Sequence, residues 1–576
     1  MAERAGRWTG RWAGAEVSRR RVFEIGGSLG LVAAGGLTLS GGLAHRPAST
    51  GRELRSAVPL PEPYTLPLPV PRVLSPVATA GGADRYEITQ RAVTAEIVPG
   101  VPTPLWTYDG TFPGPTIESR RGRPVTVLHR NELPVPTVVH LHGGRTPAAS
   151  DGYPTDLVLP HGWPDTGQEQ EHGQEHGQEH GQEHGQGQGQ EHGQGQGQGQ
   201  AHGQGHGGRH PAMHDPRAVT SRLTREYTFP LDQRAALLWY HDHRMDFTAP
   251  AIWRGLAGLH VVRDDVEDAL DLPRGDRELP LMITDRAFAA DGSMPYPSLD
   301  PLLRGRPGVS EPFSAGVLGD VILVNGAPWP VHEVDAARYR LRLLNASNAR
   351  HYELEAVAAD GRRLDLVQIG GDQGLLAAPV THARLPIAPA ERYDVLVDFA
   401  GLPVGSLVRV LNRLGVGRTR DVMAFRVART ARDTSRLPAR LAGDLPEWRR
   451  DEASVVRDFS FRAGHLEHGR GWVIGGRPFD PARTDVAARL GAVEVWRLVA
   501  DVHHPIHLHL AAFRVLSRGG GAPLPHDAGL KDTVALRPGE SAEIITRFDG
   551  YRGRYLFHCH NAEHEDMGMM ANLEIV

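Results

Sequence analysis

The sequence has almost no cysteine: its 576 residues include one, Cys559. A single cysteine excludes an internal disulfide as a source of stability. An isolated cysteine is more often a small buried hydrophobe than a functional thiol, so composition alone favours packing as the role of Cys559. Its neighbours in the sequence reverse that interpretation.

Strong charge of one sign and long apolar runs are also missing. The formal net charge is −5, which provides no basic surface, so no nucleic-acid partner is expected. Outside the N-terminal segment no run is long and apolar enough to span a bilayer, so no further membrane-spanning domain is expected. Hydrophobic residues make up 40% of the chain, which is enough for real cores, and the length suits about three domains of ~150 residues.

The N-terminus has the layout of an export signal. Arg20 and Arg21 precede Phe23 and a weakly hydrophobic, Gly/Ala-rich stretch over 25–44. A basic segment before a short apolar region is typical of a secretory signal, and the arginine pair resembles the twin-arginine type. We therefore expect 1–48 to be a twin-arginine-type signal segment and the protein to be secreted, in the cell envelope or periplasmic. A membrane anchor is the alternative.

Short alternating segments indicate an all-β chain. Apolar and polar residues alternate in many short runs bounded by Gly and Pro, as expected for the strands of β-sandwiches. A Pro-rich lead-in over 49–80 precedes three such blocks, 81–270, 271–440 and 441–576, which we interpret as three domains. The clearest predicted strands are 125–128, 137–139, 321–324, 339–344, 393–397, 493–496 and 543–546, with a turn at 537–540.

The histidines carry the strongest signal. The pattern His-x-His occurs four times, and residues i and i+2 of a strand point to the same face, so each pair can aim two imidazoles at one point. Imidazole is the commonest metal ligand in proteins. The four pairs therefore predict a metal centre built from eight imidazoles: His140 and His142, His241 and His243, His507 and His509, and His558 and His560.

The fourth pair changes the interpretation of the cysteine. Cys559 lies between His558 and His560, so on a strand its side chain points to the opposite face from theirs. One strand then serves two metal sites. Two histidines, one cysteine thiolate and a weak axial methionine form the blue-copper electron-transfer arrangement. The predicted ligands of that site are His504, Cys559, His564 and Met569.

These motifs resemble the four copper motifs of multicopper oxidases, and no ligand position departs from the family pattern. Asp109–Pro115 and Leu344–Asn348 are also similar to the three-domain bacterial laccases of the spore-coat and bilirubin-oxidase type. The resemblance covers most of the chain beyond about residue 80, apart from one insert. The motifs are His140-Leu141-His142-Gly143, Trp239-Tyr240-His241-Asp242-His243, His504-Pro505-Ile506-His507-Leu508-His509 and His558-Cys559-His560 with His564 and Met569.

The resemblance implies three cupredoxin-like Greek-key β-sandwich domains and four copper ions: one type 1, one type 2 and a type 3 pair. The cluster of three ions is then expected between the first and third domains, while the middle domain is a spacer that sets their geometry. By motif position, His140 and His507 are implied as type 2 ligands, and His142, His241, His243, His509, His558 and His560 as type 3 ligands.

The implied function is a laccase-like oxidase. It would couple the one-electron oxidation of phenolic or aromatic amine donors to the four-electron reduction of dioxygen to water. The thioether of Met569 favours a lower reduction potential and hence easily oxidised donors. Proton delivery to the cluster requires nearby acids, and Asp151 and Glu565 match the positions of proton-relay carboxylates in the family. The alternative for each is a solvated surface charge.

Two other functions stay open on sequence alone. One is a cuprous or other metal-ion oxidase in copper homeostasis. The other is a non-catalytic copper-binding protein of the cell envelope. His503, beside the type 1 motif, is interpreted equally well as a substrate contact or as a plain polar residue.

One segment departs from the strand pattern. Residues from about 166 to 214 are almost entirely Gly, Gln, Glu and His, so they cannot bury an apolar core, and we expect a disordered insert in the first domain. A repeat expansion in a tolerant loop is one interpretation. Low-affinity capture of copper ions is the other, because imidazole suits copper.

Overall fold

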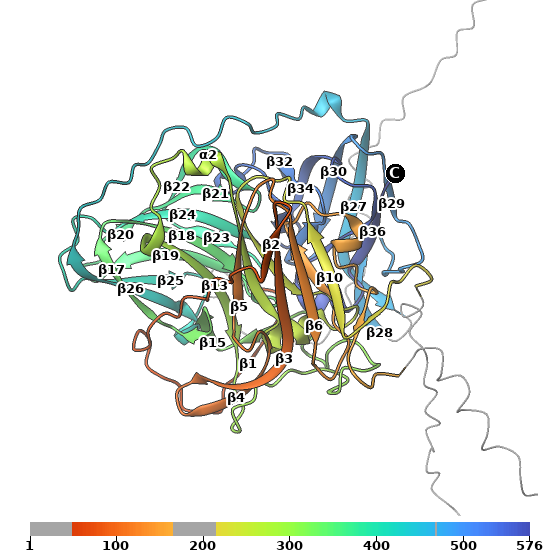
Figure 1. Cartoon of the computed structure of the whole chain (residues 1–576), viewed down its shortest axis with the longest axis horizontal. Coiled ribbons are helices and arrows are strands. Elements are labelled where there is room, and N and C mark those ends of the chain that lie inside the picture. Colours follow the sequence, from red (N-terminus) through yellow and green to blue (C-terminus); the bar gives the residue numbers. More distant parts are fainter. Residues whose placement is uncertain (1–48, 165–214, 467–468) are drawn as a thin grey trace, which may run out of the picture. The chain divides into compact units, whose positions relative to one another are not determined.

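The computed structural model describes residues 49–164, 215–466 and 469–576, and nearly half of these lie in β-strands (Figure 1). The signal segment predicted at 1–48 and the insert predicted at 166–214 lie outside the described residues, so both stay predictions. No helix in the described parts of the chain is long and apolar enough to cross a membrane. The described α-helices are α1 (Thr248–Arg254), α2 (Asp265–Asp268) and α3 (Ala562–Asp566).

The first pair of sheets encloses an apolar core. Tyr86, Val127 and Tyr227 from one sheet pack against Leu141 and Leu238 from the other. The first sheet contains β2 (Ala78–Ala80), β3 (Ala83–Val98), β4 (Val101–Tyr108), β6 (Val125–Asn131) and β10 (Thr224–Phe229). The second contains β5 (Gly114–Arg120), β7 (Val139–His142), β11 (Ala236–Asp242) and β12 (Ala257–Arg263).

The middle pair of sheets has seven and six strands. The lead-in reaches it at Pro67, which forms an isolated parallel bridge with Val331. Earlier in the lead-in, β1 (Arg52–Leu54) pairs in parallel with β14 (Val317–Gly319) in a separate two-stranded sheet. The larger sheet contains β13 (Glu278–Arg286), β15 (Val321–Val324), β16 (Ala327–Pro328), β18 (Arg338–Asn345), β21 (Leu366–Gly371), β22 (Gly374–His382) and β24 (Arg392–Asp398). The smaller contains β17 (Val331–Ala336), β19 (Tyr352–Ala358), β20 (Arg363–Leu364), β23 (Leu385–Ile387), β25 (Leu407–Asn412) and β26 (Asp421–Thr430).

The last pair of sheets holds Cys559 in its core, beside Met569 and Phe557. One sheet contains β27 (Val455–Leu466), β28 (Gly469–Ile474), β30 (Val493–Ala500), β32 (Phe513–Arg518) and β34 (Ser541–Arg547). The other contains β29 (Val486–Ala488), β31 (His504–Leu508), β33 (Thr533–Leu536), β35 (Gly553–Cys559) and β36 (Met570–Ile575).

The prediction of an all-β chain built from β-sandwiches is confirmed. Six of the seven named strand predictions lie inside observed strands, namely β6, β15, β18, β24, β30 and β34. The prediction of a strand over 137–139 is wrong in its bounds, since β7 runs over Val139–His142. Thr137 instead forms an isolated bridge with Val158. The strand therefore contains the first histidine pair, rather than ending before it.

Candidate metal centre

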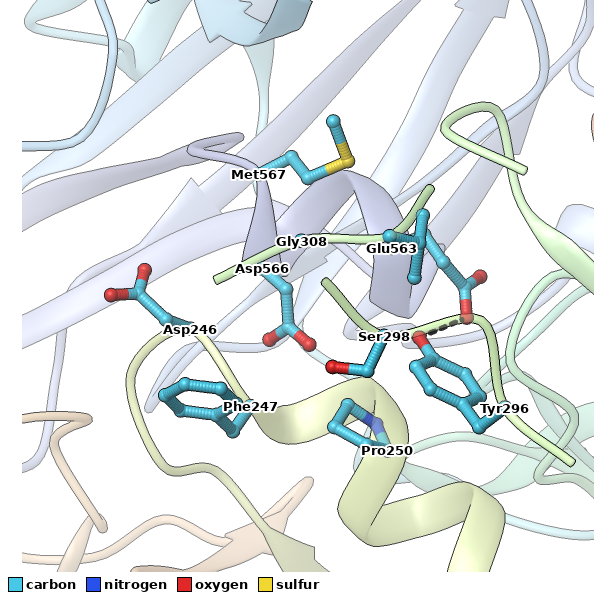
Figure 2. A pocket seen from close by; sticks show the side chains of 10 residues that line it. Asp246, Phe247, Pro250, Tyr296, Ser298, Gly308, Glu563, Asp566 and Met567 are labelled. Carbon is cyan, nitrogen blue, oxygen red and sulfur yellow. Dashed lines mark hydrogen bonds between the residues drawn. The ribbon is translucent and has the colours of Figure 1, made fainter. Parts of the chain in front are cut away.

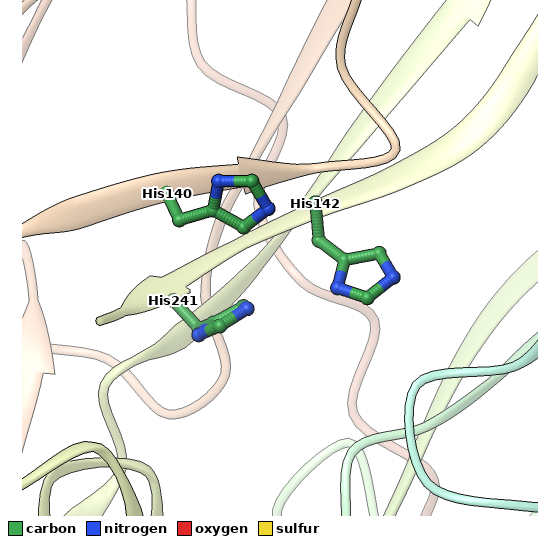
Figure 3. Close-up of side chains that lie close together, drawn as sticks. All are labelled: His140, His142 and His241. Atoms are coloured by element: carbon green, nitrogen blue, oxygen red, sulfur yellow. The ribbon is translucent and has the colours of Figure 1, made fainter. Parts of the chain in front are cut away.

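Strand pairing brings the histidine motifs together. β7 and β11 are neighbours, and their register sets His140 opposite His241. β31 and β35 are neighbours in the last pair of sheets, where His507 lies opposite His558. Figure 3 shows how the imidazoles of His140, His142 and His241 gather on one side of their strands. The same-face rule for residues i and i+2 accounts for this arrangement.

Eight imidazoles from the first and last pairs of sheets form one buried cluster. Each is at most 2% exposed. Imidazoles of the two pairs of sheets stack on each other, with ring centroids 3.9 Å apart for His140 and His509 and 3.6 Å apart for His142 and His507. The cluster contains all the histidines of the four predicted pairs: His140, His142, His241, His243, His507, His509, His558 and His560.

Several of these imidazoles offer a nitrogen that has no hydrogen-bond partner. Nδ1 of His140 lies 2.5 Å from the carbonyl oxygen of Asp151, and Nδ1 of His507 lies 2.9 Å from that of Asp532. A carbonyl only accepts, so Nδ1 carries the proton in both rings and Nε2 presents a lone pair. Buried polar atoms without a partner are rare in proteins and call for a ligand. The unpartnered atoms include Nε2 of His140, His241, His507 and His560 and Nδ1 of His142.

Three further imidazoles converge on one point. Nε2 of His558 lies 3.1 Å from Nε2 of His509 and 3.4 Å from Nε2 of His243. Nδ1 of His509 lies 2.8 Å from a carboxylate oxygen of Asp151, and Nδ1 of His558 lies 3.1 Å from the carbonyl oxygen of Cys559. These acceptors place the protons on Nδ1, so the Nε2 lone pairs face each other. A cation between them removes that repulsion.

A second group surrounds Cys559 on the other face of the strand. Its Sγ lies 3.4 Å from Nδ1 of His504 and 3.6 Å from Nδ1 of His564, and the two nitrogens are 3.1 Å apart. Nε2 of His504 donates to Asp501, and Nε2 of His564 donates to the carbonyl oxygen of Ala315. Both Nδ1 atoms therefore present lone pairs toward the sulfur, which is the donor set of a soft metal site.

The surroundings of Cys559 suit a metal-bound thiolate. Burial raises the pKa of the Cys559 thiol well above its ordinary value, so ionisation requires a strong local charge such as a coordinated metal. The backbone N–H of Asn561 points at Sγ from 3.4 Å. Met569 is fully buried in the same core, and its carbonyl oxygen accepts the N–H of Cys559 at 3.1 Å. The axial role of Met569 stays a prediction.

Asp151 and Glu565 both contact imidazoles of the cluster. Asp151 follows a short 3-10 helix over Ala148–Ser150 and supplies a carboxylate oxygen to His509. Glu565 lies on α3, with carboxylate oxygens 3.2 Å from Nδ1 of His558 and 3.5 Å from Nδ1 of His243. Each carboxylate residue is 1% exposed. The alternative of a solvated surface charge is therefore wrong for both.

The pKa values of Asp151 and Glu565 are shifted in opposite directions by their surroundings. Burial raises the pKa of Asp151 well above its ordinary value. Burial also acts to raise the pKa of Glu565, but the imidazoles of His243 and His558 outweigh it and hold that pKa below its ordinary value. The relay roles of Asp151 and Glu565 stay predictions.

A narrow pocket lies beside α3, away from the imidazoles (Figure 2). Asp246, Glu563 and Asp566 line it, and the hydroxyl of Tyr296 donates to Glu563 at 2.9 Å. Burial raises the pKa of Asp246 and of Glu563 to about 7. None of the described residues that line this pocket is a histidine, so it supplies no imidazole ligand.

Sequence reasoning missed several groups that hold the ligands. Asp532 contacts His142 and His507, and Asp501 and Ala315 bind the outer nitrogens of His504 and His564. The one signal for Asp532 is a charged pair, Lys531 and Asp532, next to the apolar strand β33. Ala315 contributes a backbone carbonyl, for which no side-chain pattern exists.

Comparison with known proteins points to one family. The family described as multicopper oxidase matches residues 89–164 and 450–576. A laccase of Bacillus stratosphericus is 34% identical over 89% of this chain and 99% of its own length. A bilirubin oxidase of Albifimbria verrucaria is 32% identical over 88% of this chain and 80% of its own length.

A solved structure gives the same result for the fold. The crystal structure of a multi-copper oxidase from Pediococcus acidilactici superimposes with a TM-score of 0.71 at 29% sequence identity. The match covers 91% of this chain and 93% of the other. The similarity therefore extends through all three pairs of sheets, including the middle pair, for which the sequence provides no ligand motif.

Proposed function

The chain belongs to the multicopper oxidase family, and we propose that it is a laccase-like oxidase whose donors are phenols or aromatic amines. It couples the one-electron oxidation of these donors to the four-electron reduction of dioxygen to water. The observation that carries the proposal is the pair of buried ligand groups, in which the inward-facing nitrogens either lack a partner or face one another and the sulfur of Cys559. Relatives that match nearly the whole chain are named laccase and bilirubin oxidase.

The donor set fits copper at both groups. Imidazole suits copper, and two imidazoles with a thiolate match the site of a single blue copper. When bound, the copper ions would accept electrons singly from the donor and deliver four to dioxygen. We propose His504, Cys559, His564 and Met569 for type 1 copper, His140 and His507 for type 2 copper, and His142, His241, His243, His509, His558 and His560 for the type 3 pair.

The protein contributes orientation and the exclusion of water. Carbonyl and carboxylate acceptors fix which nitrogen of each imidazole carries the proton, and such contacts orient ligands and tune their basicity. Trp239 stacks on His241 with 4.2 Å between ring centroids, and Trp472 stacks on His564 with 3.7 Å. Both indoles keep the ligand rings away from solvent. The peptide between Cys559 and its two flanking histidines joins the groups covalently.

We propose that electrons enter beside Asp501. The outer edge of His564 is covered, because its Nε2 is bound to Ala315 and its ring is stacked on Trp472. His504 instead donates Nε2–H at 2.8 Å to Asp501, whose side chain is 37% exposed. This carboxylate is the exposed group in direct contact with a type 1 ligand and provides an acceptor for a phenolic hydroxyl or an amine.

A metal ion as donor is the second candidate, and one observation favours it. The rings of His351 and His503 lie 5.0 Å apart, and His503 is adjacent to the type 1 ligand His504. Two imidazoles and the Asp501 carboxylate next to the electron entry are suitable ligands for a divalent or cuprous ion.

Oxygen uptake by the fully copper-loaded protein tests the proposal. We expect about four coppers per chain, uptake with methoxyphenols and aminophenols, and four donor molecules oxidised per dioxygen without peroxide. Cuprous and manganous ions are assayed alongside. Uptake with the ions alone supports the metal-oxidase candidate instead. A loaded protein that consumes no oxygen with any donor contradicts enzymatic function and leaves a copper-binding role.

Replacing the two buried carboxylates is expected to slow oxygen reduction without changing the blue colour. Asp151→Asn and Glu565→Gln keep the size of the side chains and remove the carboxyl groups that would take up and release protons next to the cluster. Loss of general acid–base assistance typically lowers a rate by about 10²- to 10⁴-fold. Reoxidation of the fully reduced enzyme by dioxygen measures this step, while the visible spectrum monitors type 1 copper.

Asp458→Asn is the matched control, because Asp458 is an exposed carboxylate on β27, in the last pair of sheets, which also contains the strand before Glu565. It should leave reoxidation unchanged. Normal reoxidation rates in both the Asp151→Asn and the Glu565→Gln variants would contradict the relay roles.

A further inference from the structure

Arg392 belongs to the middle pair of sheets but reaches the histidine cluster between the other two. It is the first residue of β24, and it is fully buried. All five N–H donors of its guanidinium are used. Two of them bind the carboxylate of Asp532, at 2.7 and 2.5 Å. The other three bind the carbonyl oxygens of Leu237, Ala390 and Asp372, at 2.9 to 3.1 Å. Such a saturated guanidinium holds its partner in one geometry.

Asp532 in turn contacts one histidine from each outer domain. Its carboxylate lies 3.2 Å from Nε2 of His142, and its carbonyl oxygen lies 2.9 Å from Nδ1 of His507. Gln373, also from the middle pair of sheets, donates to the same carboxylate at 2.6 Å. The position of Asp532 therefore fixes the relative position of His142 and His507.

The contact with Asp532 also decides which nitrogen of His142 is available. The carboxylate accepts the proton on Nε2, so Nδ1 presents a lone pair, and Nδ1 has no partner in the protein. His140 and His507 have the opposite arrangement, with Nδ1 bound to a carbonyl and Nε2 free. A reversed tautomer of His142 would direct an N–H, rather than a lone pair, at the cluster.

Two further features show that this contact is built into the fold. Asp372 accepts the backbone N–H of Arg392 at 2.8 Å, and its other oxygen lies 3.3 Å from the backbone nitrogen of Asp532. Gly143, with φ of +81°, follows His142 directly. A Cβ at this position would lie 2.6 Å from the guanidinium of Arg392 and 2.9 Å from Asp532. Only glycine permits this approach of the three segments.

We propose that Arg392 is a positioning residue of the oxygen-reducing centre: it acts through Asp532 to hold His142 in the tautomer that presents Nδ1 and to fix His142 relative to His507. The middle domain is then part of the centre rather than a spacer alone. This inference rests on the proposed assignment of both histidines to copper.

Arg392→Lys tests the proposal with the copper-loaded protein. Lysine keeps the charge but loses the planar fork that binds two carboxylate oxygens, so the substitution is not conservative at such a site. Loss of a group that orients a ligand typically costs about 10- to 100-fold in metal affinity. We expect that loss at the type 2 and type 3 sites, measured by chelator competition and by their EPR and ultraviolet absorption. The blue type 1 band should stay at full strength.

Arg340→Lys is the matched control. Arg340 is an equally buried arginine on β18, the neighbour of β24. It also binds a carboxylate through two nitrogens, Nε and Nη2 to Asp394, and its other ion-pair partners are Glu267 and Glu278. It should destabilise the fold without changing copper affinity at the cluster. If the two variants bind copper at the type 2 and type 3 sites with equal affinity, compared at equal folded fraction, the proposal is overturned. Parallel loss of type 1 copper in Arg392→Lys would overturn it too, since that indicates general unfolding.

Asp532→Asn provides a second test that keeps the proposal falsifiable if the lysine variant does not fold. Asparagine retains an acceptor oxygen but loses the ionic pairing with Arg392. We expect a cluster defect of the same kind, and little further loss in the Arg392→Lys, Asp532→Asn double variant, because the residues act in series. Fully additive defects would overturn the proposal. A wild-type protein without type 2 and type 3 signatures would instead refute the proposed function itself.

Discussion

Cys559→Ser is expected to abolish the blue colour and the oxidation of donors together. The Sγ atom lies within 3.6 Å of the facing nitrogens of His504 and His564, so it is the third member of that ligand group. A thiolate forms strong bonds to copper, whereas a serine hydroxyl has no comparable anionic form at neutral pH. Turnover should fall to the level of the uncatalysed reaction. The visible spectrum and oxygen uptake with a methoxyphenol measure the two losses.

The same variant should retain the cluster of three copper ions. His558 and His560 are unchanged, and their side chains lie on the opposite face of the strand from the cysteine. Copper analysis is therefore expected to show about three ions per chain instead of about four, by the ligand count of each site. A Cys559→Ser protein that kept either the blue band or donor oxidation would contradict the assignment. Loss of all copper would show that the variant is misfolded.

The proposed copper ligands were predictable because their spacing follows strand geometry. An alternation of histidines at i and i+2 is visible in one sequence, and the residue between them necessarily faces the other way. The twelve predicted ligands accordingly lie in two buried groups or, for Met569, in the same core as Cys559. His140 and His509 are far apart in the chain. Only the family resemblance predicted that they lie in one cluster, because spacing alone does not show which remote strands are neighbours.

The groups that orient the ligands could not be predicted in the same way. Arg392 and Asp532 are 140 residues apart, and each alone is an ordinary charged residue beside a strand. Their structural role depends on a three-dimensional contact between the middle and last pairs of sheets. Ala315 acts through its backbone, so its identity contains no information about the role.

In β18 the alternation of apolar and charged residues predicts the wrong burial for the charged ones. Its apolar residues Tyr339, Leu341 and Leu343 enter the core of the middle sheets, so Arg340 and Arg342 are expected on a solvated face. Both arginines are instead almost fully buried. They lie beneath α2, where Glu267, Glu278 and Asp394 supply the negative charges. Carboxylates from α2 and from the neighbouring strands β13 and β24 therefore make this face of the sheet a buried ionic cluster.

Glu267→Ala is expected to destabilise the protein by about 3–5 kcal/mol, the usual cost of removing one partner from a buried ion pair. Glu267 binds Arg340 at 2.9 Å and Arg342 at 2.9 and 3.0 Å, and it also accepts from Arg263 at 2.9 Å. Its removal leaves the buried guanidinium groups of Arg340 and Arg342 with Glu278 and Asp394 as their remaining carboxylates. Urea unfolding of the copper-free protein measures the change without the contribution of bound metal.

Asp265→Ala, two residues away on the same helix, is the control. Asp265 pairs with Arg120, but its side chain is 94% exposed, and exposed ion pairs contribute about 0–1 kcal/mol.

The pKa of Glu267 is below its ordinary value: burial acts to raise it, but the arginines outweigh burial. A depressed folded-state pKa stabilises the protein above the unfolded pKa of about 4.3, and this contribution is lost as pH falls below it. The stability gap between wild type and Glu267→Ala should therefore narrow in acid. Equal unfolding midpoints for Glu267→Ala and Asp265→Ala would show that the buried arginines are solvated in another way.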